Sequence, residues 1–144
     1  MATPVFVDTG AHYALTDAHD PDHEEAMRLL QQIAHHRHAM VTSNFVLSES
    51  YTLILKRMGW EIAMRYVENL KAGSTRLIRA GSEDETRAWE ILRQYRDQDF
   101  SYVDATSFAM MERLGFRVFF AFDGHFNTFR TRQGQAFTNV NFIG

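Results

Sequence analysis

The sequence predicts one α/β domain, residues 1–144, with a mainly parallel central sheet and helices on both faces. Short apolar runs typical of buried strands alternate along the chain with longer segments that have the hydrophobic period of a helix. A chain of 144 residues has the usual length of one domain, and it contains no cysteine, internal repeat or Pro/Gly-rich linker.

The first expected strand covers residues 5–8 and begins with three apolar residues. Asp20 and Pro21 signal the start of the first expected helix, with Asp20 at the N-cap and Pro21 at the first helical position. Its apolar residues recur at helical spacing, and we expect it to end near His38.

The middle of the chain predicts two strands and three helices. The expected strands are residues 39–42 and 76–79, and the expected helices are residues 44–58, 60–70 and the segment after Ser82. Gly59 suits the C-terminal cap of the first of these helices. Ser82 and Glu85 have the spacing of a capping box. We expect the helix behind that box to bury Trp89, Leu92 and Tyr95.

The C-terminal part predicts a helix over residues 102–114, closed by Gly115, and a strand over residues 116–122. A final short strand is expected around residues 136–142. The buried-looking phenylalanines of these elements predict a core rather than a surface for stacking bases.

The composition argues against a membrane protein, because the longest apolar runs of about five residues fall far short of the roughly 20 that span a bilayer. The N-terminus lacks the features of a signal peptide, so we expect a cytoplasmic protein. With a formal charge of −3, no global field attracts nucleic acid, although all but two of the basic residues are arginines, which match phosphate geometry.

Two expected strands each end in a carboxylate, Asp8 after VFV and Asp123 after VFFAF. In a parallel sheet, ligands bind in the crevice beyond the carboxyl ends of the strands, where both side chains are expected. Each aspartate has the alternative role of capping the helix that follows it. A pair of buried carboxylates in one crevice needs a cation or a shared proton.

Two further acids fit the same site. Glu49 lies in an otherwise apolar helix, and Asp104 starts a helix whose apolar face continues through Phe108 and Met111, so both are expected at the margin of a core-facing stripe. The alternative for Asp104 is an acid favoured in the first turn by the helix dipole. Four oxygen donors without a thiolate suit Mg²⁺ or Mn²⁺, which supports hydrolysis of a phosphodiester.

These four acids, in this order, resemble the pattern of the PIN-domain nucleases, and especially the VapC-type toxin ribonucleases. The matching segments are VFVDTG, VTSNFVLSES, SYVDATSFAMMERLG and FFAFDGHF. The resemblance covers essentially the whole chain. It implies that Asp8, Glu49, Asp104 and Asp123 together form an Mg²⁺ or Mn²⁺ site that cleaves RNA through a metal-activated water. It also implies a homodimer and a cognate antitoxin whose C-terminal segment covers the active groove.

The chain departs from the family pattern in three places. Ala121 stands where a hydroxyl residue is frequent, Gly124 replaces a frequent basic residue, and a further acid is missing near Asn127 and Thr128. The first two departures bear on rate and substrate preference, and the third bears on a second metal position.

Several weaker candidates surround the acids. Thr9 and Ser43 are expected to orient ligands or water, or to cap helices, and His125 to contact substrate or lie on the surface. Arg130 and Arg132 are candidates for RNA phosphates or for a solvated loop. The cluster at residues 35–38 (HHRH) suggests zinc, but it has no nearby acid or thiol to complete four ligands.

Three other functions remain compatible with the pattern. They are a housekeeping RNA-processing nuclease without an antitoxin, a non-catalytic binding module of the same fold, and a small-molecule phosphatase. The phosphatase lacks the expected second acid in the Asp8-Thr9-Gly10 segment. A pure scaffold gains nothing from crowded like charges.

Overall fold

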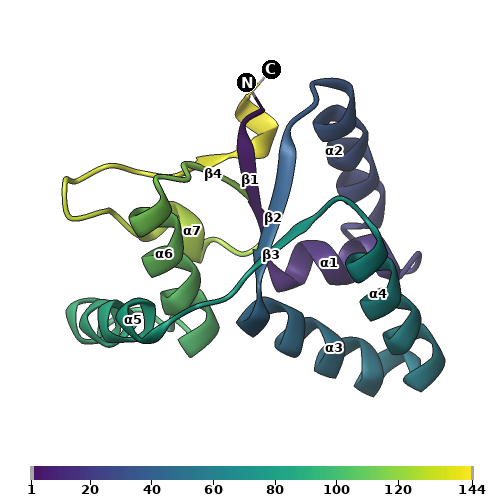
Figure 1. Ribbon diagram of the computed structural model, residues 1–144, viewed down its shortest axis with the longest axis horizontal. Coiled ribbons are helices and arrows are strands. Elements are labelled where there is room, and N and C mark those ends of the chain that lie inside the picture. Colours follow the sequence, from purple (N-terminus) through teal and green to yellow (C-terminus); the bar gives the residue numbers. More distant parts are fainter. Residues whose placement is uncertain (1, 144) are drawn as a thin grey trace.

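A computed structural model describes residues 2–143 of the chain. Five strands form one central sheet in the order β3-β2-β1-β4-β5 (Figure 1). Their bounds are β1 Pro4–Val7, β2 Ala39–Ser43, β3 Arg76–Ile78, β4 Val118–Phe120 and β5 Thr138–Asn139. The predicted α/β class with a mainly parallel sheet is confirmed, because all four strand pairs run parallel.

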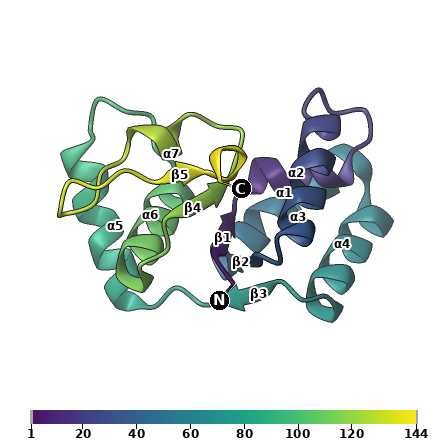
Figure 2. The same cartoon turned by 90° about the horizontal axis from the view of Figure 1, so that it is seen from above.

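Helices cover both faces of the sheet, as predicted. Their bounds are α1 Thr9–Thr16, α2 His23–His35, α3 Asn44–Met58, α4 Trp60–Ala72, α5 Ser82–Gln94, α6 Tyr102–Leu114 and α7 His125–Thr128, followed by the 3-10 helix η1 Val140–Phe142. Figure 2 shows α1, α2 and α4 on one side of the sheet and α5, α6 and α7 on the other.

The alternation of side chains along β1 divides the core in two. Val5 and Val7 pack with α1 and α2 on one face, whereas Phe6 packs with α5 and α6 on the other. Both faces of the central strands are therefore apolar, which explains their nearly continuous hydrophobic sequence.

The helix boundaries set by glycine agree with the sequence. Gly59 follows α3 with a φ of 94°, and Gly115 follows α6 with a φ of 72°. These left-handed angles favour glycine because it lacks a Cβ. The predicted helices over residues 44–58 and 102–114 are confirmed at both ends.

The sequence misplaced the beginning of α2. The helix starts at His23, not at Pro21, and ends at His35. Asp20 instead accepts the backbone N–H of Asp22 at 3.0 Å, which forms a turn before the helix. The sequence also gave no helix between Asp8 and Asp20, where α1 lies.

The prediction for α5 was wrong in two respects. Gly81, not Ser82, is the N-cap, and its N–H donates to the Asp84 carboxylate at 3.0 Å. Trp89 is 60% exposed, because the face of α5 that enters the core carries Ala88 and Ile91.

The C-terminal strands are shorter than predicted. β4 ends at Phe120, before the chain turns toward Asp123, and β5 has only two residues because η1 follows at once. The Asn139 side chain starts η1 by accepting the N–H of Asn141 at 2.9 Å. No helix within residues 2–143 has the length and apolar content to cross a membrane.

Candidate metal centre

Asp8 lies immediately after β1 and is 5% exposed. The structure contradicts the alternative that its side chain caps α1, because the carboxylate makes no capping hydrogen bond. Its Oδ1 atom is buried and has no hydrogen-bond partner. A buried carboxylate oxygen without a partner carries a large desolvation cost, which a cation would offset.

Asp104 lies in the first turn of α6 and is also buried. Its Oδ2 accepts the N–H of Ser101 at 3.0 Å, and its own N–H donates to the Ser101 Oγ at 2.9 Å. Asp104 thus fills the first-turn role that the sequence allowed as an alternative. The same Oδ2 also lies 2.9 Å from His125 Nδ1, so the capping role does not remove it from the cluster.

Asp123 and His125 bring the end of β4 to Asp104. Asp123 Oδ1 accepts the backbone N–H of His125 at 2.6 Å and lies 3.3 Å from His125 Nδ1. One potential ligand atom from each of Asp104, Asp123 and His125 lies within 4.8 Å of the others. Among the described residues this is the one group of three or more that has the spacing for a metal ion.

The pKa of Asp8 reports on its neighbours. This pKa is raised to about 7, chiefly by burial and also by the charges of Asp104, Asp123 and Glu49. A backbone hydrogen bond from Thr9 acts in the opposite direction. The charge of each of the other three acids therefore reaches Asp8, although Asp8 and Glu49 lie outside the compact group of three. A divalent cation among them would reverse this repulsion.

Glu49 is exposed, so the expectation that it lies at a buried margin is wrong. The buried residues of α3 are Val46, Ser50 and Ile54, on a different side of the helix. Glu49 faces a groove of about 340 Å³ between α3 and Val103 of α6.

His125 is the residue that the sequence undervalued. Burial alone would lower its pKa, but the hydrogen bond to Asp104 and the charges of Asp123, Asp104 and Asp99 outweigh burial and raise it. The Asp-x-His spacing after β4 was the available signal, because it places His125 only two residues after Asp123.

The two hydroxyl candidates differ. Ser43 caps α3 by accepting the N–H of Val46 at 3.1 Å, which is the alternative that the sequence left open. Thr9 lies next to Asp8, and its buried Oγ1 has no hydrogen-bond partner. Thr9 therefore retains a free hydroxyl beside the acids.

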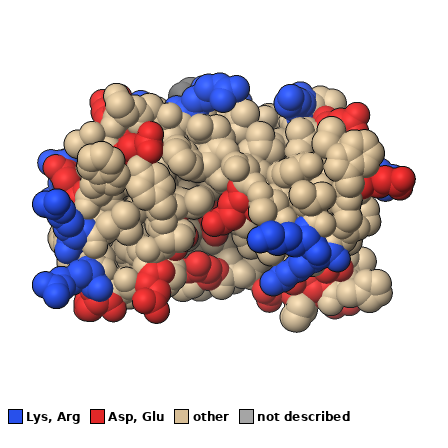
Figure 3. All heavy atoms as spheres, turned by 90° about the horizontal axis from the view of Figure 1, so that it is seen from below, with Lys and Arg blue, Asp and Glu red and all other residues tan. Residues whose placement is uncertain are grey.

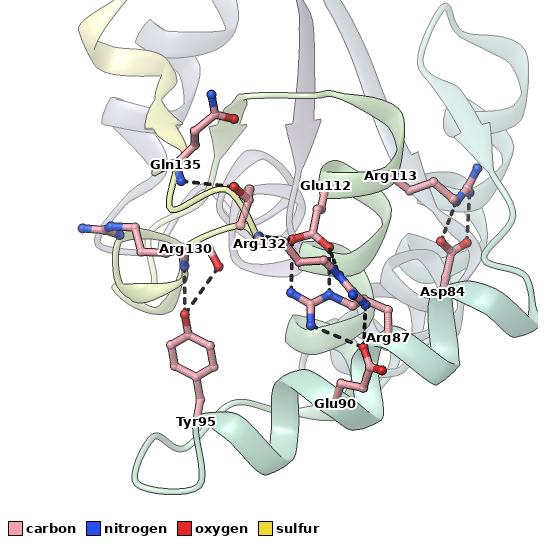
Figure 4. Close-up of polar contacts among 10 residues, drawn as sticks. Asp84, Arg87, Glu90, Tyr95, Glu112, Arg113, Arg130, Arg132 and Gln135 are labelled. Carbon is pink, nitrogen blue, oxygen red and sulfur yellow. Dashed lines mark hydrogen bonds and ion pairs between the residues drawn. The ribbon is translucent and has the colours of Figure 1, made fainter.

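The side chains of both arginine candidates contact the protein itself, and Figure 4 shows the contacts of Arg132. The Arg130 guanidinium donates to the carbonyls of Asn127 and Phe129 at 2.7 and 2.9 Å. Arg132 donates to Glu90 Oε1 at 2.7 Å, and its backbone N–H donates to Glu112 Oε2 at 2.8 Å. These contacts favour a structural role, and a role in binding RNA stays a prediction.

The histidines at residues 35–38 make contacts with one another. The ring centroids of His35 and His36 are 5.1 Å apart, and those of His36 and His38 are 5.7 Å apart. The metal-spaced group within residues 2–143 is the acidic one described above, so this part of the structure gives zinc no support.

The strands point their carboxyl ends toward the lower side of the molecule in Figure 1. Figure 3, seen from that side, shows acidic side chains near the middle of the face, with further acidic and basic side chains around them. Asp104, Asp123 and His125 supply two carboxylates and an imidazole in one compact group, and Asp8 and Glu49 add two carboxylates nearby. This donor set, which has no thiolate, fits a hard divalent cation.

Comparison with known proteins gives consistent similarities. The sequence profile of the PIN domain matches residues 5–131. The chain is 37% identical over 123 residues to the 23S rRNA-specific endonuclease VapC20 of Mycobacterium tuberculosis, covering 85% of this chain and 92% of that protein. It is 28% identical to Ribonuclease VapC26 of the same organism, covering 94% and 99%.

Two solved structures are also similar. The crystal structure of M. tuberculosis VapC20, described as a Sarcin-Ricin loop cleaving toxin, superposes with a TM-score of 0.76 at 34% identity, covering 83% of this chain and 90% of that one. VapBC2 from Rickettsia felis, bound to a promoter DNA fragment, has a TM-score of 0.68 at 11% identity, covering 95% and 97%, and shows likeness of fold alone.

Proposed function

The chain belongs to the PIN-domain family, and on this premise we propose that it is a divalent-metal-dependent endoribonuclease and the toxin of a type II toxin–antitoxin pair. The observation that carries the proposal is the buried, unpartnered Oδ1 of Asp8 beside three other carboxylates. Folding gains nothing from such crowding, whereas a metal site requires it.

The relatives support the same reaction. VapC20 is named as an endonuclease of 23S rRNA, and this chain covers 92% of its length at 37% identity. VapC26 is named a ribonuclease. RNA is therefore the proposed substrate class, and one domain over residues 1–144 is the proposed organisation.

Asp8, Asp104, Asp123 and Glu49 are the proposed metal ligands, with Mg²⁺ or Mn²⁺ as the proposed ion. When bound, such an ion lowers the pKa of a water and neutralises charge on a phosphodiester. The carboxylates of the chain would hold the ion in place. His125 fixes two of them, because its backbone N–H contacts Asp123 and its Nδ1 contacts Asp104.

The proposed partners are a cognate antitoxin and a second copy of the chain, in the cytoplasm. The 34% identity to VapC20, which is described as a toxin, supports the proposal that this chain has a cognate antitoxin. Co-expression tests the antitoxin. The product of the adjacent reading frame should co-purify with this protein and should restore growth of cells that express this protein. Expression of this protein alone without growth arrest would contradict the toxin role.

The nuclease is tested with purified protein and end-labelled RNA in Mn²⁺. We expect cleavage that EDTA abolishes and that Asp8→Asn and Asp104→Asn each reduce by at least about a hundredfold. The matched control is Asp97→Asn, which changes an exposed aspartate outside the site and should keep full activity. Equal activity of Asp8→Asn and the parent protein would refute the proposal.

A further inference from the structure

Trp89 is exposed to 60% on α5, although the sequence predicted that it is buried. Single exposed apolar residues are common and need no explanation. Trp89, however, does not stand alone. Its indole Nε1 donates to the Tyr102 hydroxyl at 3.1 Å, and that hydroxyl donates to Glu85 Oε1 at 2.5 Å. The indole is therefore held in position by a chain of two hydrogen bonds.

A third ring extends this arrangement to α3. The rings of Tyr102 and Phe45 lie 5.8 Å apart between centroids, with their planes inclined by 58°. Tyr102 and Phe45 are each only partly buried. We call Phe45, Trp89 and Tyr102 the aromatic surface; three different helices contribute to it.

The aromatic surface adjoins the acids. Phe45 precedes Glu49 by one turn of α3, and Tyr102 lies two residues before Asp104 at the start of α6. Phe45 and Glu49 also line the groove of about 340 Å³. Lys56 lines it as well, seven residues beyond Glu49 and therefore about 10 Å along the helix.

We propose that the aromatic surface and this groove bind an unpaired nucleotide next to the phosphodiester at the acids. The base lies against Trp89 and its neighbouring rings, and Lys56 contacts a phosphate. This inference rests on the proposed nuclease function, because an RNA strand whose phosphate reaches the acids must pass over the side chains beside them. Stacking requires a base that is not paired within a helix, which selects loops and single strands.

The lining of the groove favours RNA over a second copy of the chain. It combines the hydroxyls of Ser48 and Thr52 and the charges of Glu49 and Lys56 with three partly buried apolar side chains. The centre of a protein interface is depleted in charged residues, whereas contacts to nucleic acid combine rings, hydroxyls and cations.

The test measures binding without cleavage. A fluorescein-labelled single-stranded RNA of six nucleotides is titrated in EDTA, and the fluorescence anisotropy gives the Kd. We expect Trp89→Ala to weaken binding about tenfold, since stacking on one aromatic ring contributes about that factor. The control is Trp60→Ala, because Trp60 is similarly exposed at 62% but lies at the start of α4, outside both the aromatic surface and the groove.

An abasic version of the RNA separates stacking from other effects. The Trp89→Ala protein and the parent should bind it equally when the missing base is the one that stacks. Lys56→Gln should weaken binding of both RNAs by the same factor, because it removes a phosphate contact.

Equal binding of the intact RNA by Trp89→Ala and the parent protein overturns the proposal. Light scattering measures the oligomeric state of both proteins. If Trp89→Ala loses a dimer that the parent forms, and its RNA affinity per subunit is unchanged, the aromatic surface binds a second copy of the chain instead. Because binding is measured without metal, these failures differ from failure of the nuclease function, which is the absence of RNA cleavage by the parent protein in Mn²⁺.

Discussion

His125 Nδ1 lies 2.9 Å from the Oδ2 atom of Asp104, a contact that joins α7 to the first turn of α6. The imidazole thereby holds a carboxylate whose other hydrogen bonds come from its own helix start.

Replacement of His125 should loosen the acids without removing any of them. We expect His125→Ala to lower kcat/KM for RNA by about 10- to 100-fold and to raise the Mn²⁺ concentration needed for half-maximal activity, as loss of a residue that orients ligands does elsewhere. The control is His19→Ala, whose side chain is 98% exposed. An unchanged metal requirement in His125→Ala would show that the contact has no orienting role.

Removal of the Asp8 charge should stabilise the metal-free protein. The pKa of Asp8 is raised to about 7 from 3.8, so stability is lost as pH rises between these values, and the loss is complete above pH 7. We expect Asp8→Asn to increase the free energy of unfolding at pH 8 in EDTA by about 2–4 kcal/mol. Mn²⁺ should raise the Tm of the parent protein more than that of the variant. A destabilised Asp8→Asn in EDTA would contradict the charge crowding.

His12 should lower the free energy of unfolding as the pH falls below about 6.5. Burial lowers its pKa from 6.5 to about 4, against a hydrogen bond to the Val7 backbone. Between these values the unfolded chain binds a proton that the folded protein does not, so stability falls as pH falls. From pH 7 to pH 5 the parent should lose about 2 kcal/mol more than His12→Gln, measured by urea unfolding. His19→Gln, at an exposed position, should follow the parent.

Glu112 should stabilise the loop that carries Arg132. Its carboxylate accepts hydrogen bonds from two nitrogens of the Arg87 guanidinium, at 2.7 and 3.1 Å. It also accepts one from the backbone N–H of Arg132 at 2.8 Å (Figure 4). The Arg87 and Glu112 side chains are only 14% and 12% exposed. Glu112→Ala leaves the guanidinium without its main partner, so we expect a loss of about 2–3 kcal/mol in the free energy of unfolding.

The matched control for Glu112 is Glu25→Ala, which breaks an exposed pair with Arg28. Because exposed pairs contribute little, its loss should stay below about 1 kcal/mol. Similar losses in both variants would mean that the buried network contributes no more than a surface pair does.

The sequence predicted the parts of the fold that depend on local patterns. The sheet class and the ends of α3 and α6 follow from apolar periodicity and from Gly59 and Gly115, which act within a few residues. The positions of Asp8 and Asp104 were expected because each aspartate lies at the end of a strand or helix that the apolar pattern predicts. The assignment of the four acids as metal ligands stays a prediction.

The errors concern tertiary contacts. Trp89 looked buried by spacing, but Ala88 and Ile91 fill that part of the core, and Tyr102 and Glu85 hold the indole outside it. The partners of Arg132 lie on α5 and α6, which no local pattern identifies. His125 was undervalued because its distance to Asp104 depends on how α7 turns back toward α6.

The sheet ends on both sides in very short strands, three residues in β3 and two in β5. Such edges expose few free backbone amides and carbonyls, and Arg76 places an exposed charge at one of them. Newly made copies of this protein therefore present little to which a neighbouring chain can add a strand, which protects it from edge-to-edge aggregation when it accumulates alone.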